Sequence, residues 1–531
     1  MADANPQRNP SRSPTRSVPL QRRRFSPLIL VIPLATIYRF AIILPTTTSF
    51  RIIQLVACQV WYHWNDPSTI PTPESCSTPG VDRYYSAIIS ILAIGDGIGG
   101  IFGCAVVSFL SSRFGRKPVL LGLIFIGVLS HFSILTSQLL EGWKQVVMFA
   151  VWAAFELTGS SLATIFAINL YILDFAQAEE RSIALSRIAG WSYLGSALAL
   201  LLGGSITVHT QATIAVYITS LTILGSLLLY TMVAVPESFP ASKREQLRRE
   251  RAATAPSSQP LIQRLKSSTA FVSEPLQLFK PHYNPLTGRR NWRLVYCAIH
   301  IFIVGVADGY AVLAMVLYFI TYYKYTPAQT GYVLTIVHIT NVVVLTVLVP
   351  LVLRFLKPLY ARNEPFSISG LDTPAGEDGN HIGTINEDGP SEAVSRTSDH
   401  LDVHLTIVSW AIESLAYIGV GAATTLATQL VAVICIGFGA GRAPVFRSLV
   451  AASVNPLKQG EALASTEMVS NLASMLSPIL MGNIMTLTIT SAPQTIFYVH
   501  AVIIAAGAAV LFLVKDEDRY QKPAIFLESE D

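Results

Sequence analysis

Residues 108–117 read SFLSSRFGRK and stand at the junction of two long apolar runs, residues 84–110 and 118–138. Three positions in this stretch are basic, and a glycine lies between the two arginines. Each flanking run is long enough for a helix that crosses a bilayer core of about 30 Å, which takes about 20 residues. The stretch is therefore predicted to be a short polar turn between two membrane-spanning helices.

The same pattern recurs along the rest of the chain. Ten further apolar runs cover residues 28–48, 144–173, 185–207, 213–234, 293–320, 331–353, 404–426, 429–450, 465–487 and 495–514. Hydrophobic residues make up 51% of the chain and charged residues only 13%, and the mean hydropathy is +0.49. A soluble domain carries roughly 25% charged residues, so this composition excludes an ordinary soluble enzyme.

The runs predict an all-α membrane protein with twelve transmembrane helices. Six of them form an N-terminal bundle over residues 26–238, and six form a C-terminal bundle over residues 293–514. A basic linker, residues 239–292, joins the two bundles. Polar tails cover residues 1–25 and 515–531, and an acidic loop rich in Gly and Ser covers residues 357–403. The first tail and the acidic loop are expected to be disordered because they contain too few apolar residues to form a core.

The positions of Lys and Arg predict the orientation, because cytosolic loops are enriched in both. With both termini in the cytosol, all but six of the 37 basic residues fall in cytosolic tails and loops. The six exceptions are Arg39 and Arg442 within spans and Arg51, Arg83, Lys144 and Lys324 in loops on the outer side. The net charge of +4 therefore reflects membrane orientation, and no nucleic-acid partner is expected.

Two of the five cysteines, Cys58 and Cys76, lie in the first outer loop. An oxidising compartment would permit a disulfide between them, and the sequence leaves open whether it forms. The other three lie in predicted spans, where a free cysteine usually acts as a small apolar packing residue.

Six plus six spans with a long middle segment and both ends inside resemble the major facilitator superfamily, whose two bundles are pseudo-symmetric. Arg113, Gly115, Arg116 and Lys117 match that superfamily's signature between its second and third helices. Ser108 replaces the usual Gly, and Ser112 replaces the usual Asp. In the superfamily this Asp helps to hold the two halves together on the cytosolic side. The resemblance thus implies a conformational gate that is weaker here or built differently.

Two glycine patterns mark close helix packing. In the fifth span, Gly195, Gly203 and Gly204 resemble the superfamily's antiporter motif, with Ala199 for a Gly and Leu200 for the Pro. In the second span, glycines recur at every fourth position, Gly95, Gly99 and Gly103. Small residues at such spacing let helices approach closely and need no role in transport.

The first outer loop and the end of the tenth span, Arg447 to Leu449, resemble fungal members related to tetracycline-efflux and proton-coupled folate-type carriers. This resemblance implies a carrier of small organic molecules. It leaves the direction of transport open, because one group exports its substrates and the other takes them up.

Four ionisable residues lie near the middle of spans one, four, seven and ten: Arg39, Glu156, Asp308 and Arg442. A charged side chain at the bilayer centre costs about 2.5–3.5 kcal/mol, so each is expected to face a cavity or a partner. The resemblance implies that these spans line the central cavity. The four residues are therefore predicted to bind substrate and protons, with Glu156 or Asp308 carrying the proton. The alternative is a permanent ion pair in each half, Arg39–Glu156 and Asp308–Arg442.

Two further carboxylates lie within spans. Asp96, inside the glycine face of the second span, is a candidate proton site or part of a polar crevice. Glu413 lies in the ninth span, which the resemblance places at the periphery, so a packing or interfacial role is expected for it.

The sequence contains no Walker loop, no HExxH zinc motif and no nucleophile elbow, so a secondary carrier and not an enzyme is expected, without cofactor or metal. The expected function is proton-coupled efflux of a small organic molecule by alternating access. Proton-coupled uptake and a non-transporting receptor with the carrier fold are the alternatives. The chain is expected to be a monomer in the plasma membrane, or in a vacuolar or other internal membrane.

Overall fold

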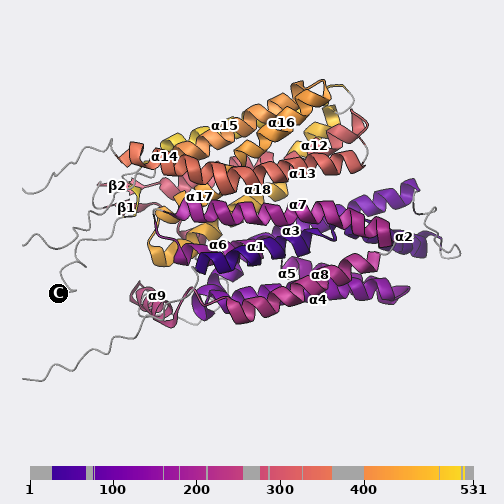
Figure 1. The fold of residues 1–531 in the computed structure, drawn as a ribbon, viewed down its shortest axis with the longest axis horizontal. Helices are drawn as coiled ribbons and strands as arrows, with labels where there is room; N and C mark the ends of the chain where they lie inside the picture. The colour runs from indigo at the N-terminus through magenta and orange to yellow at the C-terminus, as the bar shows by residue number, and fades with distance from the viewer. Residues whose placement is uncertain are drawn as a thin grey trace, which may run out of the picture.

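The computed structural model describes residues 27–66, 76, 78–159, 161–178, 180–210, 213–254, 275–284, 288–325, 327–361, 400–488, 491–515 and 518–520. It contains 12 helical segments that are long and apolar enough to cross a membrane. They run side by side along the long axis of the molecule (Figure 1). The predicted number of spans and the all-α membrane fold are therefore confirmed. The N-terminal tail, predicted to be disordered, lies outside the described residues.

The N-terminal half consists of α1 (Pro27–Ile43), α2 (Thr46–Asn65), α3 (Pro79–Phe114), α4 (Arg116–Leu139), α5 (Trp143–Thr158), α6 (Ser161–Phe175), α7 (Arg181–Thr210) and α8 (Thr213–Ala234). The linker contains α9 (Ala241–Thr254) and an antiparallel pair of short strands, β1 (His282–Asn284) and β2 (Arg289–Asn291), in which His282 pairs with Asn291. The basic run of the linker is thus helical.

The C-terminal half consists of α12 (Arg293–Thr321), α13 (Pro327–Val343), a π-helical turn η2 (Val344–Leu348), α14 (Val349–Ala361), α15 (His400–Ala422), α16 (Leu426–Phe438), a 3-10 turn η3 (Gly439–Gly441), α17 (Arg442–Ala452), η4 (Pro456–Lys458), α18 (Gln459–Thr488), α19 (Thr495–Val510) and η5 (Leu511–Leu513). Both borders of the predicted acidic loop are helical, because α14 runs to Ala361 and α15 starts at His400. The rest of that loop lies outside the described residues.

Two predicted spans have different bounds in the structure. The first continues to Asn65 because the helix only pauses at Pro45, which has no N–H to donate, and resumes as α2. The fourth is divided into α5 and α6 after Thr158. In both cases the helices lie within or next to the predicted apolar run. The residues at which a helix pauses or continues depend on local backbone geometry.

The two ends of the molecule are named here by the residues that mark them. The linker end carries α9, and the disulfide end carries the bond between Cys58 and Cys76, whose Cα atoms are 5.4 Å apart. In Figure 1, α9 and the free end of α2 lie at opposite ends of the long axis.

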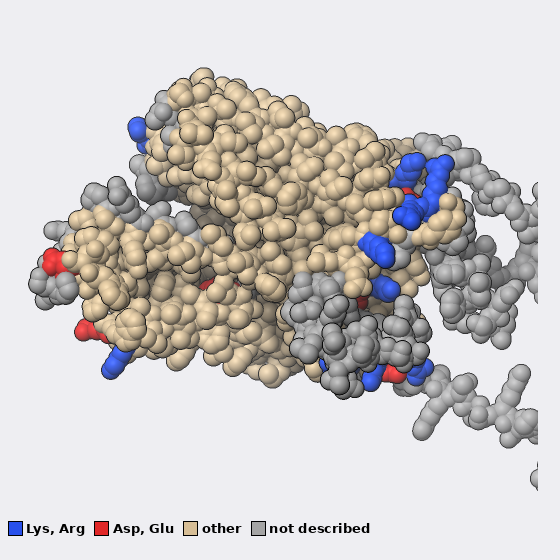
Figure 2. All heavy atoms as spheres, turned by 180° about the vertical axis from the view of Figure 1, so that it is seen from behind, with Lys and Arg blue, Asp and Glu red and all other residues tan. Residues whose placement is uncertain are grey.

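Within the described residues, the two halves share a large hydrophobic core at the linker end. One buried cluster there combines Leu120 and Ile168 of the N-terminal half with Phe446 and Leu463 of the C-terminal half. Toward the disulfide end each half has its own cluster, around Ile52, Phe149 and Tyr217 in one and around Tyr318, Tyr417 and Phe497 in the other. Figure 2 shows a hollow between the two lobes at the disulfide end. The halves thus enclose a cleft that opens toward the disulfide end.

Candidate functional site

Three charged side chains from three helices meet near the middle of the C-terminal half. Arg442 Nη2 lies 3.2 Å from Asp308 Oδ1 and 3.3 Å from Oδ2, and its Nη1 lies 2.8 Å from Glu413 Oε2. Asp308 is on α12, Glu413 on α15, and Arg442 is the first residue of α17. We refer to these three residues as the arginine triad. Two carboxylates share one guanidinium, so the fully ionised triad carries one surplus negative charge.

Small residues make this meeting of helices feasible. The turn η3 consists of Gly439, Ala440 and Gly441 and directly precedes Arg442. A Cβ atom on Gly439 would lie only 2.9 Å from Glu413 Cβ and 3.1 Å from the Ser409 carbonyl oxygen. A larger residue there would push α15 away from the turn. The glycine therefore lets Glu413 approach Arg442 to ion-pair distance.

The three side chains differ in their access to solvent. Asp308 is 35% exposed, Arg442 20%, and Glu413 only 1%. Tyr193 of α7 lies within electrostatic range of Arg442, so the triad faces the N-terminal half. Asp308 is the most exposed of the three side chains, and Glu413 is the most buried.

A second layer of aromatic residues fixes the arginine. The guanidinium lies 4.7 Å from the centre of the Trp410 ring, within the range of a cation–π interaction. Trp410 Nε1 donates to His300 Nε2 at 3.1 Å, so the His300 proton resides on Nδ1 and is donated to the Gly507 carbonyl oxygen at 2.8 Å. The indole plane is therefore held by a buried hydrogen-bond chain, and it in turn holds Arg442.

A closely packed group of aromatic and apolar side chains lies beside the triad. Its members come from α12, α15, α18 and α19 and are Tyr310, Ala311, Ala314, Tyr417, Met481, Ile496, Phe497 and His500. His500 is 1% exposed, and neither of its ring nitrogens makes a hydrogen bond of ordinary geometry with the described residues. The imidazole packs against the Tyr417 ring, with 4.2 Å between the ring centres.

The N-terminal half is organised differently. Glu156 accepts a hydrogen bond from Ser130 Oγ at 2.5 Å, and Arg39 is half-buried on α1. No ion pair joins Arg39 to Glu156 in the described part of the chain. The alternative of one permanent pair in each half is therefore wrong for the N-terminal half and describes the C-terminal half only in part. Asp96 is exposed on α3.

The glycine patterns lie at helix crossings. A Cβ on Gly195 of α7 would lie 2.1 Å from the Thr36 carbonyl oxygen of α1, and one on Gly203 would lie 2.4 Å from that of Leu44. On α3, Cβ atoms on Gly95 and Gly99 would collide with Leu157. The two remaining glycines of these patterns are Gly103, which faces Ala163, and Gly204, which lies within α7.

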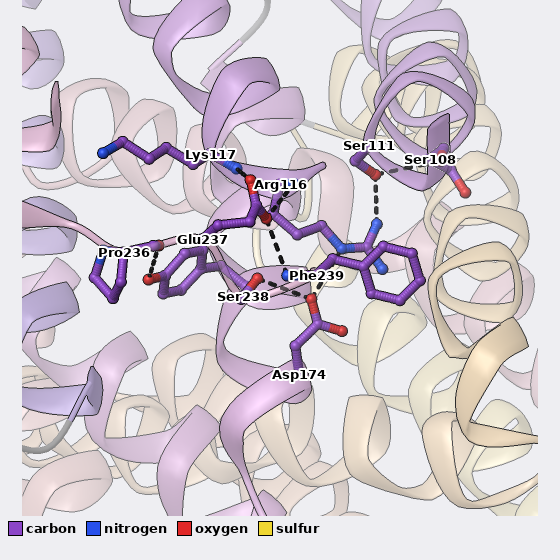
Figure 3. Close-up of polar contacts among 10 residues, drawn as sticks. Ser108, Ser111, Arg116, Lys117, Asp174, Pro236, Glu237, Ser238 and Phe239 are labelled. Atoms are coloured by element: carbon purple, nitrogen blue, oxygen red, sulfur yellow. Dashed lines mark hydrogen bonds and ion pairs between the residues drawn. The ribbon is translucent and has the colours of Figure 1, made fainter. Parts of the chain in front are cut away.

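The signature stretch that follows α3 forms a second charged network at the linker end (Figure 3). Arg116 is 7% exposed, its Nε lies 3.0 Å from Asp174 Oδ2, and Nη1 donates to Ser111 Oγ. Glu237, after α8, accepts from the backbone N–H groups of Arg116 at 2.8 Å, Lys117 at 3.2 Å and Phe239 at 2.9 Å. We call Arg116, Asp174 and Glu237 the Arg116 network.

Gly115 permits this arrangement in two ways. Its φ of +106° is a conformation that other residues rarely adopt, and a Cβ would lie 2.6 Å from Glu237 Oε2. The glycine therefore turns the chain into α4 and leaves room for a carboxylate at the start of that helix, where backbone N–H groups favour negative charge.

The other signature residues take smaller roles in the network. Arg113 is exposed beside Phe114, and Lys117 Nζ donates to the Met232 carbonyl oxygen at 2.7 Å. Ser112, at the position of the superfamily's Asp, bonds back to the Phe109 carbonyl oxygen of its own helix. The carboxylates of this network thus come from Asp174 and Glu237, and Arg116 lies against Gly460 at the start of α18 in the other half.

Sequence reasoning missed Glu413. It is buried next to Arg442 and does not have the peripheral role expected for the ninth span. The available signal was that Glu413 is the one carboxylate within residues 404–426. A second pair, Arg447 Nε to Glu467 Oε1 at 2.7 Å, links α17 and α18 closer to the linker end.

Comparison with known proteins gives three further findings. The sequence profile of the Major Facilitator Superfamily matches residues 78–364 and 394–529. The chain is 45% identical over 416 residues to the "Major facilitator-type transporter psiT1" of Psilocybe cyanescens, covering 76% of this chain and 87% of that protein.

Two solved structures have the same fold. The human organic anion transporter MFSD10 (TETRAN) gives a TM-score of 0.62 at 14% identity and covers 91% of this chain and 99% of that one. The proton:xylose symporter XylE gives a TM-score of 0.61 at 14% identity, with 92% and 96% covered.

Profile, relative and fold agree with the twelve apolar helices. The fungal relative also agrees with the predicted likeness to fungal carriers. The protein is a multi-pass membrane transporter of a small molecule, not an enzyme, and the chain belongs to the major facilitator superfamily.

Proposed function

We propose that this protein exports a small organic molecule in exchange for protons, by alternating access. The observation that carries the proposal is the Asp308–Arg442 ion pair, in which a partly exposed carboxylate lies mid-helix beside the cleft. Ionisable groups at this depth are costly and are typical of substrate and proton pathways. Arg39, Glu156 and Asp96 belong to the same proposed site on the N-terminal side.

The proposed orientation places the linker end in the cytosol, because cytosolic loops are enriched in Lys and Arg. The exposed Lys243, Arg248 and Arg249 of α9 lie at that end. The cleft at the disulfide end would then face outward, and the shared core at the linker end would close the cytosolic side. Packing of Arg116 against the start of α18 and the Ser182–Asp402 hydrogen bond at 2.7 Å support this closure.

Coupling follows from the chemistry of the pair. A proton on Asp308 removes one of the two charges that hold Arg442, and the arginine then depends on Glu413 alone. A ligand or proton that changes this balance binds to the two conformations of the carrier with different free energies. Such a difference in binding free energy is what shifts the population from one conformation to the other. Substrate binding and proton binding are thereby linked at one carboxylate.

Export is favoured by the glycines of α7, whose pattern resembles the antiporter motif, and is consistent with a place in the plasma membrane. Uptake by symport is the second candidate, because Leu200 stands where that motif has its Pro. Fluorescence microscopy of the tagged chain would check the membrane, and failure to reach the plasma membrane would contradict export from the cell.

The test uses purified full-length protein in proteoliposomes with an imposed pH gradient. We expect outwardly directed substrate movement to accompany inward proton flux, and we expect Asp308→Asn to abolish the gradient-driven part. Glu141→Gln is the matched control, because Glu141 is an exposed carboxylate at the loop between α4 and α5. Substrate moving in the same direction as protons would favour uptake. Unchanged coupled flux in both Asp308→Asn and Glu156→Gln would show that protons are carried elsewhere.

The rival reading is a non-transporting receptor with the carrier fold. It predicts saturable binding of a ligand but no flux of that ligand under any gradient. The same proteoliposomes separate the two readings, since binding and flux can be measured on one preparation.

A further inference from the structure

We propose that the basic helix α9 of the linker binds the anionic headgroups of the membrane leaflet at the linker end. The partner is a lipid surface that contains phosphatidylserine or another phospholipid of net negative charge. The inference goes beyond the proposed function and does not depend on the direction of transport. It takes from that proposal only the cytosolic orientation of the linker end, because the cytosolic leaflet is the anionic one.

The sequence of α9 is strongly basic. Its 14 residues, ASKREQLRRERAAT, contain five Lys or Arg and two Glu. Figure 2 shows Lys and Arg side chains gathered at the linker end of the molecule, and Figure 1 places α9 there at the edge of the N-terminal half. Clusters of about four to eight basic residues next to a transmembrane helix are typical of segments that bind anionic lipids.

Three of these basic residues share one side of α9 with its single leucine. Lys243 and Leu247 are four residues apart, as are Arg244 and Arg248, so the four side chains lie on neighbouring rows of the helix. We call Lys243, Arg244 and Arg248 the basic face of α9. Leu247 is only 3% exposed, which shows that this side of the helix is turned toward the protein.

One hydrogen bond fixes where α9 is attached. Arg244 Nη1 donates to the carbonyl oxygen of Phe114, the last residue of α3, at 2.7 Å. A cation is favoured at this place, because the carbonyl groups at the end of a helix carry partial negative charge. The basic face thus lies against the linker end of a membrane span.

Exposed apolar side chains show that this is also the edge of the hydrocarbon layer. Phe114 is 55% exposed, and Val233 in the last turn of α8 is 78% exposed. Apolar surface that stays exposed on the outside of a bundle of spans is suited to lipid tails. Lys117 lies at the same edge, since its Nζ donates to the Met232 carbonyl oxygen at 2.7 Å. The basic face of α9 therefore lies at the depth where phospholipid phosphate groups begin.

The pairing of charges distinguishes the two sides of α9. On the side away from Leu247, Arg249 Nε lies 3.3 Å from Glu245 Oε1, and the two charges cancel. Lys243 and Arg248 are exposed, and neither forms an ion pair with a carboxylate within the described residues. An acidic cytosolic protein would meet the neutral side of α9 first. The uncompensated charges lie on the side of the bundle and the bilayer edge, which favours a lipid surface.

The experiment measures amide hydrogen exchange of α9 in the purified full-length protein, held in two kinds of lipid nanodisc. One contains phosphatidylcholine alone, and the other contains phosphatidylcholine with one quarter phosphatidylserine. Each basic residue near an anionic surface contributes about 1 kcal/mol, a factor of about five, so we expect exchange to be slower by about fivefold or more in the second nanodisc. High salt should remove the difference, because it screens exposed charges.

Two variants of α9 provide a matched comparison. Lys243→Gln combined with Arg248→Gln removes two charges of the basic face, and we expect the protection by phosphatidylserine to be lost. Arg249→Gln is the control, because it removes one charge of the same helix from the side that is already paired with Glu245. Arg248→Lys keeps the charge and should keep the protection. Thermal unfolding confirms that each variant is folded.

Three results would overturn the inference. Equal exchange of α9 in the two nanodiscs would show that it is an ordinary solvated helix. Loss of protection in Arg249→Gln as complete as in the double variant would refute the assignment of the basic face. Protection in detergent by soluble glycerophosphoserine, as strong as in the nanodisc, would indicate a site for a free phosphate ester and not for a lipid surface. The assay needs no substrate, so it stays informative if the proposed transport function fails.

Discussion

The molecule contains two networks of the same composition, one arginine with two carboxylates, in two different settings. In the Arg116 network, Glu237 accepts from three backbone N–H groups and Asp174 accepts from Arg116 and from Ser238 Oγ at 2.9 Å. In the arginine triad, the donors that reach the carboxylates within the described residues come from Arg442. The carboxylates of one network are met by several independent donors, and those of the other share a single guanidinium.

This difference supports the proposal that the triad, and not the Arg116 network, binds protons. Carboxylates that are met by backbone donors gain nothing from a ligand, and their loss is a loss of stability. A carboxylate that shares its only cation with another carboxylate gains from a proton or a ligand cation. The two networks are therefore distinguished by the number of donors that each carboxylate meets and not by the number of charges.

The largest expected effect comes from removing the arginine of the triad. Arg442→Met leaves Asp308 and Glu413 without their counter-ion, and we expect loss of transport and a destabilisation of about 3–5 kcal/mol. Arg39→Met is the matched variant in the other half, because Arg39 has no ion pair with Glu156, and we expect a change below about 1 kcal/mol. Thermal unfolding in detergent measures both, and equal losses would contradict the asymmetry between the halves.

A smaller effect is expected in the Arg116 network when its turn is blocked. Gly115→Ala places a Cβ next to Glu237 in an unfavourable backbone conformation, and we expect a cost of about 1–3 kcal/mol. Gly122→Ala on α4 is the control, because nothing lies within 4 Å of its added Cβ. The same unfolding assay applies, and a Gly115→Ala variant as stable as Gly122→Ala would show that Glu237 does not depend on this turn.

The smallest effect is expected from neutralising the helix cap. Glu237→Gln keeps one acceptor oxygen for the α4 N–H groups, so we expect a loss of about 0.5–2 kcal/mol. The ratio of protons to substrate in proteoliposome flux should not change, since Glu237 contacts the start of α4 and the triad residues belong to α12, α15 and α17. A change in this ratio would mean that the two networks are coupled.

The fold was predictable because the signal is long and repetitive. Twelve apolar runs fix the number of spans, and the basic loops predict their orientation. The break at Pro45 is readable from the proline itself, but the continuation of the helix to Asn65 and the division of the fourth span after Thr158 are not, because they depend on backbone hydrogen bonds that composition does not report.

The site was predictable only in part. The Asp308–Arg442 pair is predictable from the mid-span positions and opposite charges of the two residues. The Arg39–Glu156 pair is not formed, and Glu156 instead accepts a hydrogen bond from Ser130 of the neighbouring helix. Glu413 was missed because its contact with Arg442 depends on how closely α15 approaches Gly439. Such distances between helices are set by packing, and no local pattern in the sequence encodes them.

The central claim is that the triad exchanges charge and the Arg116 network does not. The most direct measurement compares Asp308→Asn with Asp174→Asn, the same chemical change in each network, by substrate-dependent proton flux in proteoliposomes. We predict that Asp308→Asn loses this flux while remaining folded, and that Asp174→Asn keeps the ratio of protons to substrate at reduced stability. The reverse pattern, or equal losses of coupling in both variants, would contradict the account.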